Sequence, residues 1–208
     1  MENSKIPDIL YIDEEIIVIN KPAGLLSVPG LYNKDCAVSR LEEVYGELFI
    51  IHRLDQDTSG ILVYARNKKS LTHIQQQFEK QKTRKVYECL VIGQLRGTQG
   101  CVNLPICVDW PNRPLQKISH TDGRYALTRW KRLEQTADST RVELYPQTGR
   151  SHQLRIHMLN LGHAIVGDPF YAPESAKENE RLMLHARELD FTHPTREERM
   201  QFKLAVPF

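Results

Sequence analysis

An α+β fold is what this sequence predicts, and two observations predict it. Apolar, β-branched segments are joined by short polar turns, and segments with apolar residues at helical spacing lie between them. Because strands joined by short turns pair antiparallel, we expect a mixed, mainly antiparallel central sheet with flanking helices. The 208 residues, 40% apolar and 26% charged, suffice for a buried core, so we expect one domain spanning residues 1–208.

Five segments carry the pattern of strands. Apolar and β-branched residues dominate each of them, and the first ends at Lys21-Pro22 because proline cannot donate a hydrogen bond to a sheet. Residues 97–100 are rich in glycine and predict a turn, and residues 136–139 predict the turn of a hairpin. The predicted strands are residues 15–20, 61–65, 85–93, 125–134 and 141–146.

Two helices are predicted from the spacing of their apolar residues. The first begins after Asn67, a candidate N-cap, and ends in a basic stretch near Lys82. The second ends at Gly162, a residue that suits the C-terminus of a helix. We assign the apolar residues of both helices to the core; they are Leu71, Ile74 and Phe78 in the first helix and Leu154, Met158 and Leu161 in the second.

The composition argues against membrane, secreted and metal-ribbon proteins. The four cysteines form no Cys-x-x-Cys pair, so neither a zinc ribbon nor a redox dithiol is indicated. The first residues lack the basic start and apolar stretch of a secretory signal, and no apolar run approaches the roughly 18 residues that a spanning helix requires. We expect a soluble, cytoplasmic protein with reduced thiols and no membrane contact.

Positive charge is concentrated in the middle of the chain. The formal net charge is only +2, but residues 51–155 carry 18 Lys and Arg against 9 Asp and Glu, and the segments on either side are acidic. Such a distribution suits a polyanion bound over one face, although each cluster alone is also what a solvated face shows. The basic residues gather at 66–69, 80–85 and 124–132.

Residues 52–60 form a charged turn directly before the apolar segment 61–65. The turn reads His-Arg-Leu-Asp-Gln-Asp-Thr-Ser-Gly, which places Arg53, Asp55 and Asp57 beside a segment that we expect to be buried. A turn that only reversed the chain would need Gly, Asn or Pro chemistry. Charge held beside a core indicates a function. The alternative is a solvated loop with an ion pair between Arg53 and Asp57.

The same nine residues resemble the signature of the RluA-type RNA pseudouridine synthases. That signature is His-Arg-Leu-Asp, two variable residues and Thr-Ser-Gly before an apolar run, and all seven fixed positions match. The resemblance implies the pseudouridine synthase fold with a central RNA-binding cleft, and it implies that Asp55 is catalytic. Isomerisation of uridine to pseudouridine involves no net redox change or hydrolysis, so no cofactor and no metal are expected. Larger members carry an S4 RNA-binding domain, which we do not expect here because the first strand begins near Leu10.

A second segment, residues 146–155, resembles a family motif whose arginine pairs with the catalytic aspartate. The matching residue is Arg150, and a cation would also keep a buried carboxylate ionised. We expect Arg150 just before or inside the first turn of a helix, with Thr148 or Ser151 as the N-cap. The alternative is that Arg150 and Arg155 bind phosphate at the helix start.

Tyr87 and Leu184 match family positions that contact the base. The resemblance implies that Tyr87 packs against the uracil and helps to remove the proton from C5, whereas a strand tyrosine is otherwise a core residue. It implies that Leu184 forms part of the floor under the base. The target uridine must leave its stack, and the planar guanidinium of Arg53 suits the gap that remains. The candidate catalytic residues are Asp55, Tyr87 and Arg150, and the candidate substrate-binding residues are His52, Arg53, Arg155 and Leu184.

Two further segments indicate a branch of the family, and one segment departs from it. Residues 20–30 and 109–117 are similar to the members that modify both a tRNA and a 23S rRNA. This implies a uridine in the tRNA anticodon stem-loop, in a 23S rRNA stem-loop, or in both, as the target. In residues 123–128 Tyr125 replaces a family proline, which bears on RNA selectivity and not on the reaction. No protein partner is implied, and we expect a monomer.

Other functions fit the sequence less well. His152 and His157 are five residues apart, off the four-residue spacing that would place both on one metal. No Gly-x-Ser-x-Gly or phosphate-loop sequence is present, which argues against a serine hydrolase and a P-loop NTPase. Two alternatives stay open: a related enzyme that acts on a different rRNA or tRNA uridine, and an RNA-binding module without catalysis. The second would require the loss of Asp55 or Arg150, and both are present.

Overall fold

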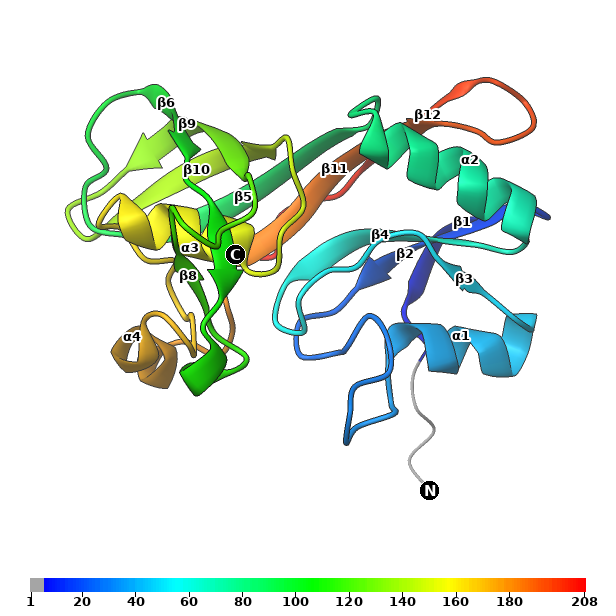
Figure 1. The fold of residues 1–208 in the computed structure, drawn as a ribbon, viewed down its shortest axis with the longest axis horizontal. Coiled ribbons are helices and arrows are strands. Elements are labelled where there is room, and N and C mark those ends of the chain that lie inside the picture. The colour runs from blue at the N-terminus through cyan, green and yellow to red at the C-terminus, as the bar shows by residue number, and fades with distance from the viewer. Residues whose placement is uncertain (1–5) are drawn as a thin grey trace. The chain divides into compact units, whose positions relative to one another are not determined.

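In the computed structural model, which describes residues 6–208, the contacts divide the chain into two compact units (Figure 1). The first unit combines the residues up to Lys85 with residues 186–205, and the second combines residues 86–185 with residues 206–208. The chain passes from one unit to the other inside β5 (Arg84–Ile92) and again inside β11 (Leu184–Thr192). A single domain over residues 1–208 stays a prediction.

The first unit is a sheet with a helix on each face, α1 on one and α2 on the other (Figure 1). All seven residues of β4 are buried, because both of its faces are covered. Ile61 and Val63 join Ile74 of α2 in one apolar cluster, while Tyr64 points to the opposite face. The strands follow the order β1–β2–β4–β11, with β3 beside β4 and β12 beside β11. The elements are β1 (Asp8–Ile12), β2 (Ile16–Lys21), α1 (Ala37–Tyr45), β3 (Phe49–Ile50), β4 (Ser59–Ala65), α2 (Lys68–Glu79) and β12 (Arg199–Lys203).

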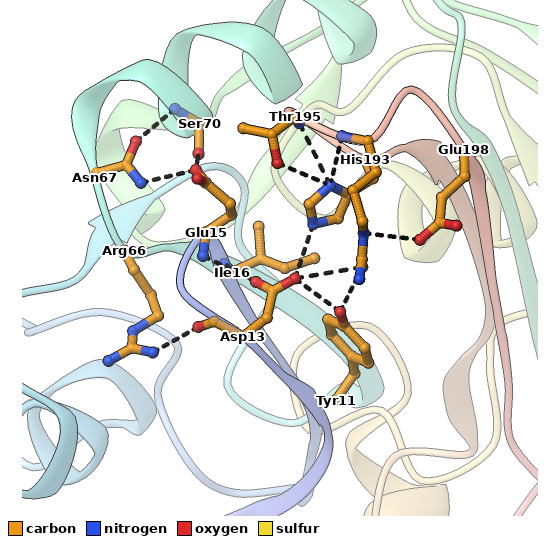
Figure 2. Close-up of polar contacts among 11 residues, drawn as sticks. Tyr11, Asp13, Glu15, Ile16, Arg66, Asn67, Ser70, His193, Thr195 and Glu198 are labelled. Carbon is orange, nitrogen blue, oxygen red and sulfur yellow. Dashed lines mark hydrogen bonds and ion pairs between the residues drawn. The ribbon is translucent and has the colours of Figure 1, made fainter.

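A partly buried polar cluster lies around Asp13 in the first unit, and Figure 2 shows its contacts. Asp13, in the turn between β1 and β2, accepts hydrogen bonds from the hydroxyl of Tyr11 at 2.7 Å and from His193 Nε2 at 2.8 Å. Burial opposes ionisation of Asp13, but these bonds and those from the backbone N–H groups of Ile16 and Glu15 outweigh it and lower the pKa to about 2. The cluster therefore ties the first hairpin to the turn between β11 and β12.

The second unit is an antiparallel sheet in the order β5–β10–β9–β6. Helix α3 packs on one face, where Leu154 and Met158 join Val142 and Leu144 in an apolar cluster. A separate hairpin, β7–β8, lies in the connection between β6 and β9. The elements are β6 (Gln99–Asn103), β7 (Ile106–Val108), a 3₁₀ helix η1 (Trp110–Asn112), β8 (Gln116–Ile118), β9 (Leu127–Gln135), β10 (Ser139–Pro146), α3 (Gln153–Asn160) and α4 (Pro173–Glu178).

The structure confirms the predicted α+β class, the mainly antiparallel pairing, the five strands and both helices. Asn67 is the N-cap of α2, where its side chain accepts a hydrogen bond from the Ser70 N–H. The prediction of a turn at residues 97–100 is wrong at its end, because Gln99 and Gly100 begin β6. Gly100 is there for space: a Cβ at this position would lie 2.8 Å from the ring of Trp130.

Two further observations concern the expected class of protein. All four cysteines are free thiols, as predicted. Within residues 6–208 no helix is long and apolar enough to cross a membrane.

Candidate active site

The candidate catalytic residue Asp55 begins a tight turn that leads into β4. The Asp55 carbonyl accepts the N–H of Thr58 at 3.1 Å, and the turn places Ser59 and Gly60 as the first residues of the strand. Gly60 has φ +117°, and a Cβ there would lie 2.3 Å from the carbonyl oxygen of Ala186. Only glycine allows this approach, so the glycine that ends the signature is required by packing.

A buried lysine holds the backbone of the Asp55 turn. The side chain of Lys21 is 0% exposed, and its ammonium donates to the carbonyl oxygens of Pro22 at 2.8 Å, Leu25 at 2.7 Å and Gln56 at 2.9 Å. Three donors meet three acceptors, which offsets the cost of removing the charge from water. Lys21 thus joins the residue after Asp55 to the loop that follows β2.

Ser27 holds the residue before Asp55 in the same way. Its hydroxyl donates to the Leu54 carbonyl at 2.7 Å and accepts the Leu54 N–H at 3.1 Å. Gly24 adds a third link, because its N–H donates to the Gln56 carbonyl at 3.0 Å. The loop that follows β2 therefore fixes the backbone on both sides of Asp55.

Lys21 and Ser27 belong to a segment that the sequence matched to the family, but no role was inferred for either. The signal was present in Lys21, a charged residue at the end of a run of buried apolar ones. Its acceptor on Gln56 lies 35 residues away, which spacing alone does not reveal.

His52 faces the interior of the first unit. Its ring stacks on Phe78 with centroids 4.8 Å apart, and Nε2 accepts the Val63 N–H at 3.3 Å. Burial and the nearby charge of Lys85 lower the pKa of His52 to about 3, so the imidazole is neutral at physiological pH. These contacts anchor the start of the signature to β4 and α2. Arg53, the next residue, is exposed, and Asp55 is half-buried.

Tyr87 and Leu184 belong to one apolar cluster of the second unit. Leu184 is 2% exposed within the apolar cluster beneath α3, and Tyr87 packs against that cluster. Tyr87 is opposite Leu144 in the pairing of β5 with β10, so both side chains point to the same face of the sheet. The two residues that are predicted to contact the base thus belong to the same cluster.

Arg150 lies in the loop before α3, as predicted, and its side chain is exposed. Its Nε donates to the Tyr125 carbonyl at 3.0 Å, and its backbone N–H donates to Gln153 Oε1 at 3.0 Å. The prediction that Thr148 or Ser151 caps the helix is wrong. The N-cap is His152, in the left-handed region at φ 52°, and no side chain caps it. Thr148 instead donates its hydroxyl to Gln153 Oε1 at 2.7 Å.

Arg155 is buried on α3 and forms a two-bond ion pair with Asp168. Its Nε and Nη2 lie 2.7 and 2.6 Å from the two carboxylate oxygens, and both side chains are at most 1% exposed. The rings of Phe170 and Tyr171 lie against the guanidinium, 5.0 and 5.3 Å from it. The pair joins α3 to the loop after it, and a contact of Arg155 with RNA stays a prediction.

The candidate residues thus form two groups. His52, Arg53 and Asp55 share one turn of the first unit, while Tyr87, Arg150, Arg155 and Leu184 belong to the second. The pairing of Asp55 with Arg150 stays a prediction. Among residues 6–208, no three His, Cys, Asp or Glu side chains are grouped so that they could hold a metal ion.

Comparison with known proteins shows which family this chain is similar to. The model of the RNA pseudouridylate synthase family matches residues 15–160, which include the Asp55 turn and the Arg150 loop. The dual-specificity RNA pseudouridine synthase RluA of Pasteurella multocida is 48% identical over 205 residues, covering 97% of this chain and 94% of its own. RluA of Escherichia coli is 45% identical over 217 residues, covering 100% of this chain and 99% of its own.

Among solved structures, human RNA pseudouridylate synthase domain containing 1 has a TM-score of 0.80 at 27% identity and covers 99% of this chain and 85% of its own. The pseudouridine synthase fold that the Asp55 signature implied is therefore confirmed. The chain belongs to the RNA pseudouridylate synthase family.

Proposed function

We propose that this protein isomerises specific uridines of structured RNA to pseudouridine and that Asp55 is its catalytic carboxylate. One observation carries the proposal: all seven fixed positions of the family signature are present, and the turn that bears Asp55 is held on both sides by Lys21 and Ser27. Such fixed placement is what a reacting group needs.

The targets that we propose are uridine 32 in the tRNA anticodon stem-loop and uridine 746 in 23S rRNA. The similarity to the dual-specificity enzymes extends over nearly the whole chain, which favours their pair of targets over another uridine. A uridine in the loop of such an RNA is unpaired, so it leaves its stack at a lower energetic cost than a base in a duplex.

The reaction breaks two bonds and makes two. The bond from C1′ of the ribose to N1 of the base breaks, the detached uracil turns, and C1′ bonds to C5. The proton leaves C5, and N1 ends protonated, so atoms and electrons balance without an oxidant or a cofactor. Asp55 acts on the ribose or the base, and Tyr87 takes part in removing the proton from C5.

The other candidate residues hold the substrate. Arg150 pairs with the Asp55 carboxylate and keeps it ionised. Leu184 lies under the uracil, and Arg53 fills the stack that the uridine has left. His52 and Arg155 support the substrate site, the first from within the turn and the second from α3. We also propose that the protein acts in the cytoplasm and as a monomer, and light scattering of the purified protein tests its oligomeric state.

The direct experiment assays purified protein with each of the two stem-loops, labelled with tritium at C5 of uridine. Release of tritium reports turnover, and mapping of the product reports the position. Asp55→Asn should lower turnover by about 1,000-fold or more, because the amide neither attacks nor accepts a proton. Asp57→Asn is the matched control, two residues along the same turn and at a variable family position, and should retain activity. Equal activity of Asp55→Asn and wild type would exclude the assigned role.

A second variant tests the partner of Asp55. Arg150→Lys keeps the positive charge but loses the planar fork that binds a carboxylate through two bonds, so turnover should fall strongly. Tritium release under saturating RNA measures it. Undiminished turnover would show that the partner of Asp55 is a different cation.

A further inference from the structure

The second unit has a groove that the proposed catalytic residues do not use. It lies on β6, β9 and β10, has a volume of about 670 Å³, and falls in the usual size range of ligand sites. Side chains of these strands alternate between two faces. Val102, Trp130 and Leu144 point into the apolar core beneath α3, and their sequence neighbours line the groove. The lining side chains include Gln99, Cys101, Asn103, Arg129, Lys131 and Tyr145.

Strand register sets these side chains in two rows across the sheet. Arg129 is opposite Cys101 on one side and Tyr145 on the other, and Lys131 is opposite Gln99. The two cations are two residues apart on β9, which separates them by roughly 7 Å along the strand. Successive phosphates of an extended RNA strand are separated by a comparable distance.

The two cations have no partner among the residues that the structure describes. Arg129 and Lys131 are both exposed, and across residues 6–208 neither side chain forms an ion pair or a hydrogen bond. A carboxylate does lie on the same face, that of Glu143, which is opposite Lys131 in the register. It is 9% exposed and accepts the Tyr145 hydroxyl, so it does not line the groove.

The remaining side chains suit an unpaired base. The ring of Tyr145 provides a flat surface for stacking, and the amides of Gln99 and Asn103 can bond to base edges. Proteins bind single-stranded nucleic acid with this combination, in which cations bind the phosphates and an aromatic ring stacks on a base.

We propose that this groove is an accessory RNA site that binds an unpaired segment flanking the modified stem-loop, with phosphates on Arg129 and Lys131 and a base on Tyr145. The proposal rests on the proposed function, since it takes the substrate RNA as the ligand. Tyr87 points to the opposite face of this sheet, so the nucleotide in the groove is not the one that reacts. The groove therefore contributes to RNA affinity and not to the chemical step.

Affinity measurements test the two cations. Arg129→Ala/Lys131→Ala should weaken binding of a 23S rRNA fragment with unpaired flanks by about tenfold or more and lower the slope of log affinity against log salt by about 2. Turnover at saturating RNA should stay at the wild-type value while KM rises. Lys177→Ala/Lys203→Ala removes the same charge from two side chains that are 69% and 71% exposed elsewhere. An equal loss of affinity in both double variants would overturn the proposal.

Tyr145 allows a sharper test of stacking. Tyr145→Phe keeps the ring and removes the hydroxyl that donates to Glu143, whereas Tyr145→Ala removes the ring. RNA affinity should be kept in the first variant and lost in the second. Loss in both variants, or in neither, would exclude stacking on this ring.

Cys101 reports occupancy without any reaction. It is the exposed cysteine of the chain, Cys107 is half-exposed, and Cys36 and Cys89 are buried. In a Cys107→Ser background, saturating RNA should slow maleimide labelling of Cys101, and it should do so equally in the Asp55→Asn variant. Protection of Cys101 in a protein that keeps Asp55 but shows no isomerase activity would support the groove and refute the proposed function. Turnover without protection of Cys101 would support the proposed function and refute the groove as an RNA site.

Discussion

The turn that bears Asp55 and the loop that bears Arg150 are held in place by different means. Around Asp55 the bonds go to peptide groups: Lys21 and Ser27 bind the backbone of the residues on either side. Around Arg150 the neighbouring side chains take part: Gln153 Oε1 accepts the Arg150 N–H, the Arg150 guanidinium itself donates to the Tyr125 carbonyl, and Arg155 pairs with Asp168 in the loop after α3. The position of Asp55 is thus fixed through the backbone of its turn, whereas the position of the Arg150 loop is fixed by contacts with α3, which follows it.

This difference separates stability from catalysis. A buried ion pair is costly to break, because the remaining charge has no water around it. A lysine that binds three carbonyls shapes the chain locally, so its loss moves the turn more than it unfolds the protein. Of these contacts, loss of the ion pair should therefore lower stability most, and loss of Lys21 should lower turnover most.

Breaking the Arg155 pair should have the largest effect on stability. Arg155→Met leaves the Asp168 carboxylate buried, and the free energy of unfolding should fall by about 3–5 kcal/mol. Urea denaturation measures it. Arg40→Met is the matched control, because Arg40 binds Asp35 with the same two-bond geometry at the surface, at 2.7 and 2.6 Å, and should lose less than about 1 kcal/mol. Similar losses in both variants would contradict the importance of burial.

Replacing Lys21 should affect turnover more than RNA binding. Lys21→Met removes the donor from one buried carbonyl oxygen, that of Leu25, and from two partly buried ones, those of Pro22 and Gln56. We expect kcat to fall by more than tenfold with little change in KM, since the turn that carries Asp55 shifts and the basic surface does not. Lys34→Met removes an exposed lysine that donates to the Gly30 carbonyl at 2.9 Å and should leave kcat unchanged. A higher KM with wild-type kcat would refute this account.

Ser27→Ala should have a smaller effect of the same kind. It removes both hydrogen bonds to Leu54 and should lower the free energy of unfolding by about 1–2 kcal/mol. The turn keeps its Lys21 and Gly24 links, so kcat should fall less than in Lys21→Met. Parallel urea and tritium-release measurements give both quantities, and a larger kcat loss than in Lys21→Met would reverse the ranking.

The smallest effect should come from His52 and should appear only on acidification. In the unfolded chain His52 binds a proton below about pH 6.5, whereas its folded pKa is about 3. The wild type should therefore lose stability as the pH falls below 6.5, by about 0.7 kcal/mol between pH 7 and pH 6. His52→Gln, whose amide oxygen can accept the Val63 N–H, should lack this share of the pH dependence. Identical profiles for both proteins would contradict it.

Sequence periodicity predicted the elements whose apolar residues repeat regularly. β4 and α2 were predicted because Ile61, Val63 and Ile74 each lie at the spacing of a strand or a helix. β6 was not, because Gly97 and Gly100 have the composition of a turn, and the need for Gly100 arises from the ring of Trp130, which lies on a different strand. Packing between residues that are distant in the sequence cannot be predicted from local sequence patterns.

The candidate site shows the same limit. Asp55 and Arg150 lie in continuous motifs and could be found from the sequence alone. The roles of Lys21 and Asp168 depend on partners 35 and 13 residues away, which become visible only when the chain is folded. The N-cap of α3 was missed because the backbone of His152 adopts a left-handed conformation, which is uncommon for a histidine.

The discontinuous make-up of the first unit has a consequence for synthesis on the ribosome. Its apolar cluster includes Leu189 and Phe191 from β11 and Phe202 from β12, which are translated after residues 86–185 of the second unit. The core of the nascent N-terminal half therefore stays incomplete until β11 and β12 emerge from the ribosome. During that interval its exposed apolar side chains are available to chaperones. A stop codon before β11 would yield a chain that is prone to aggregation rather than a smaller folded enzyme.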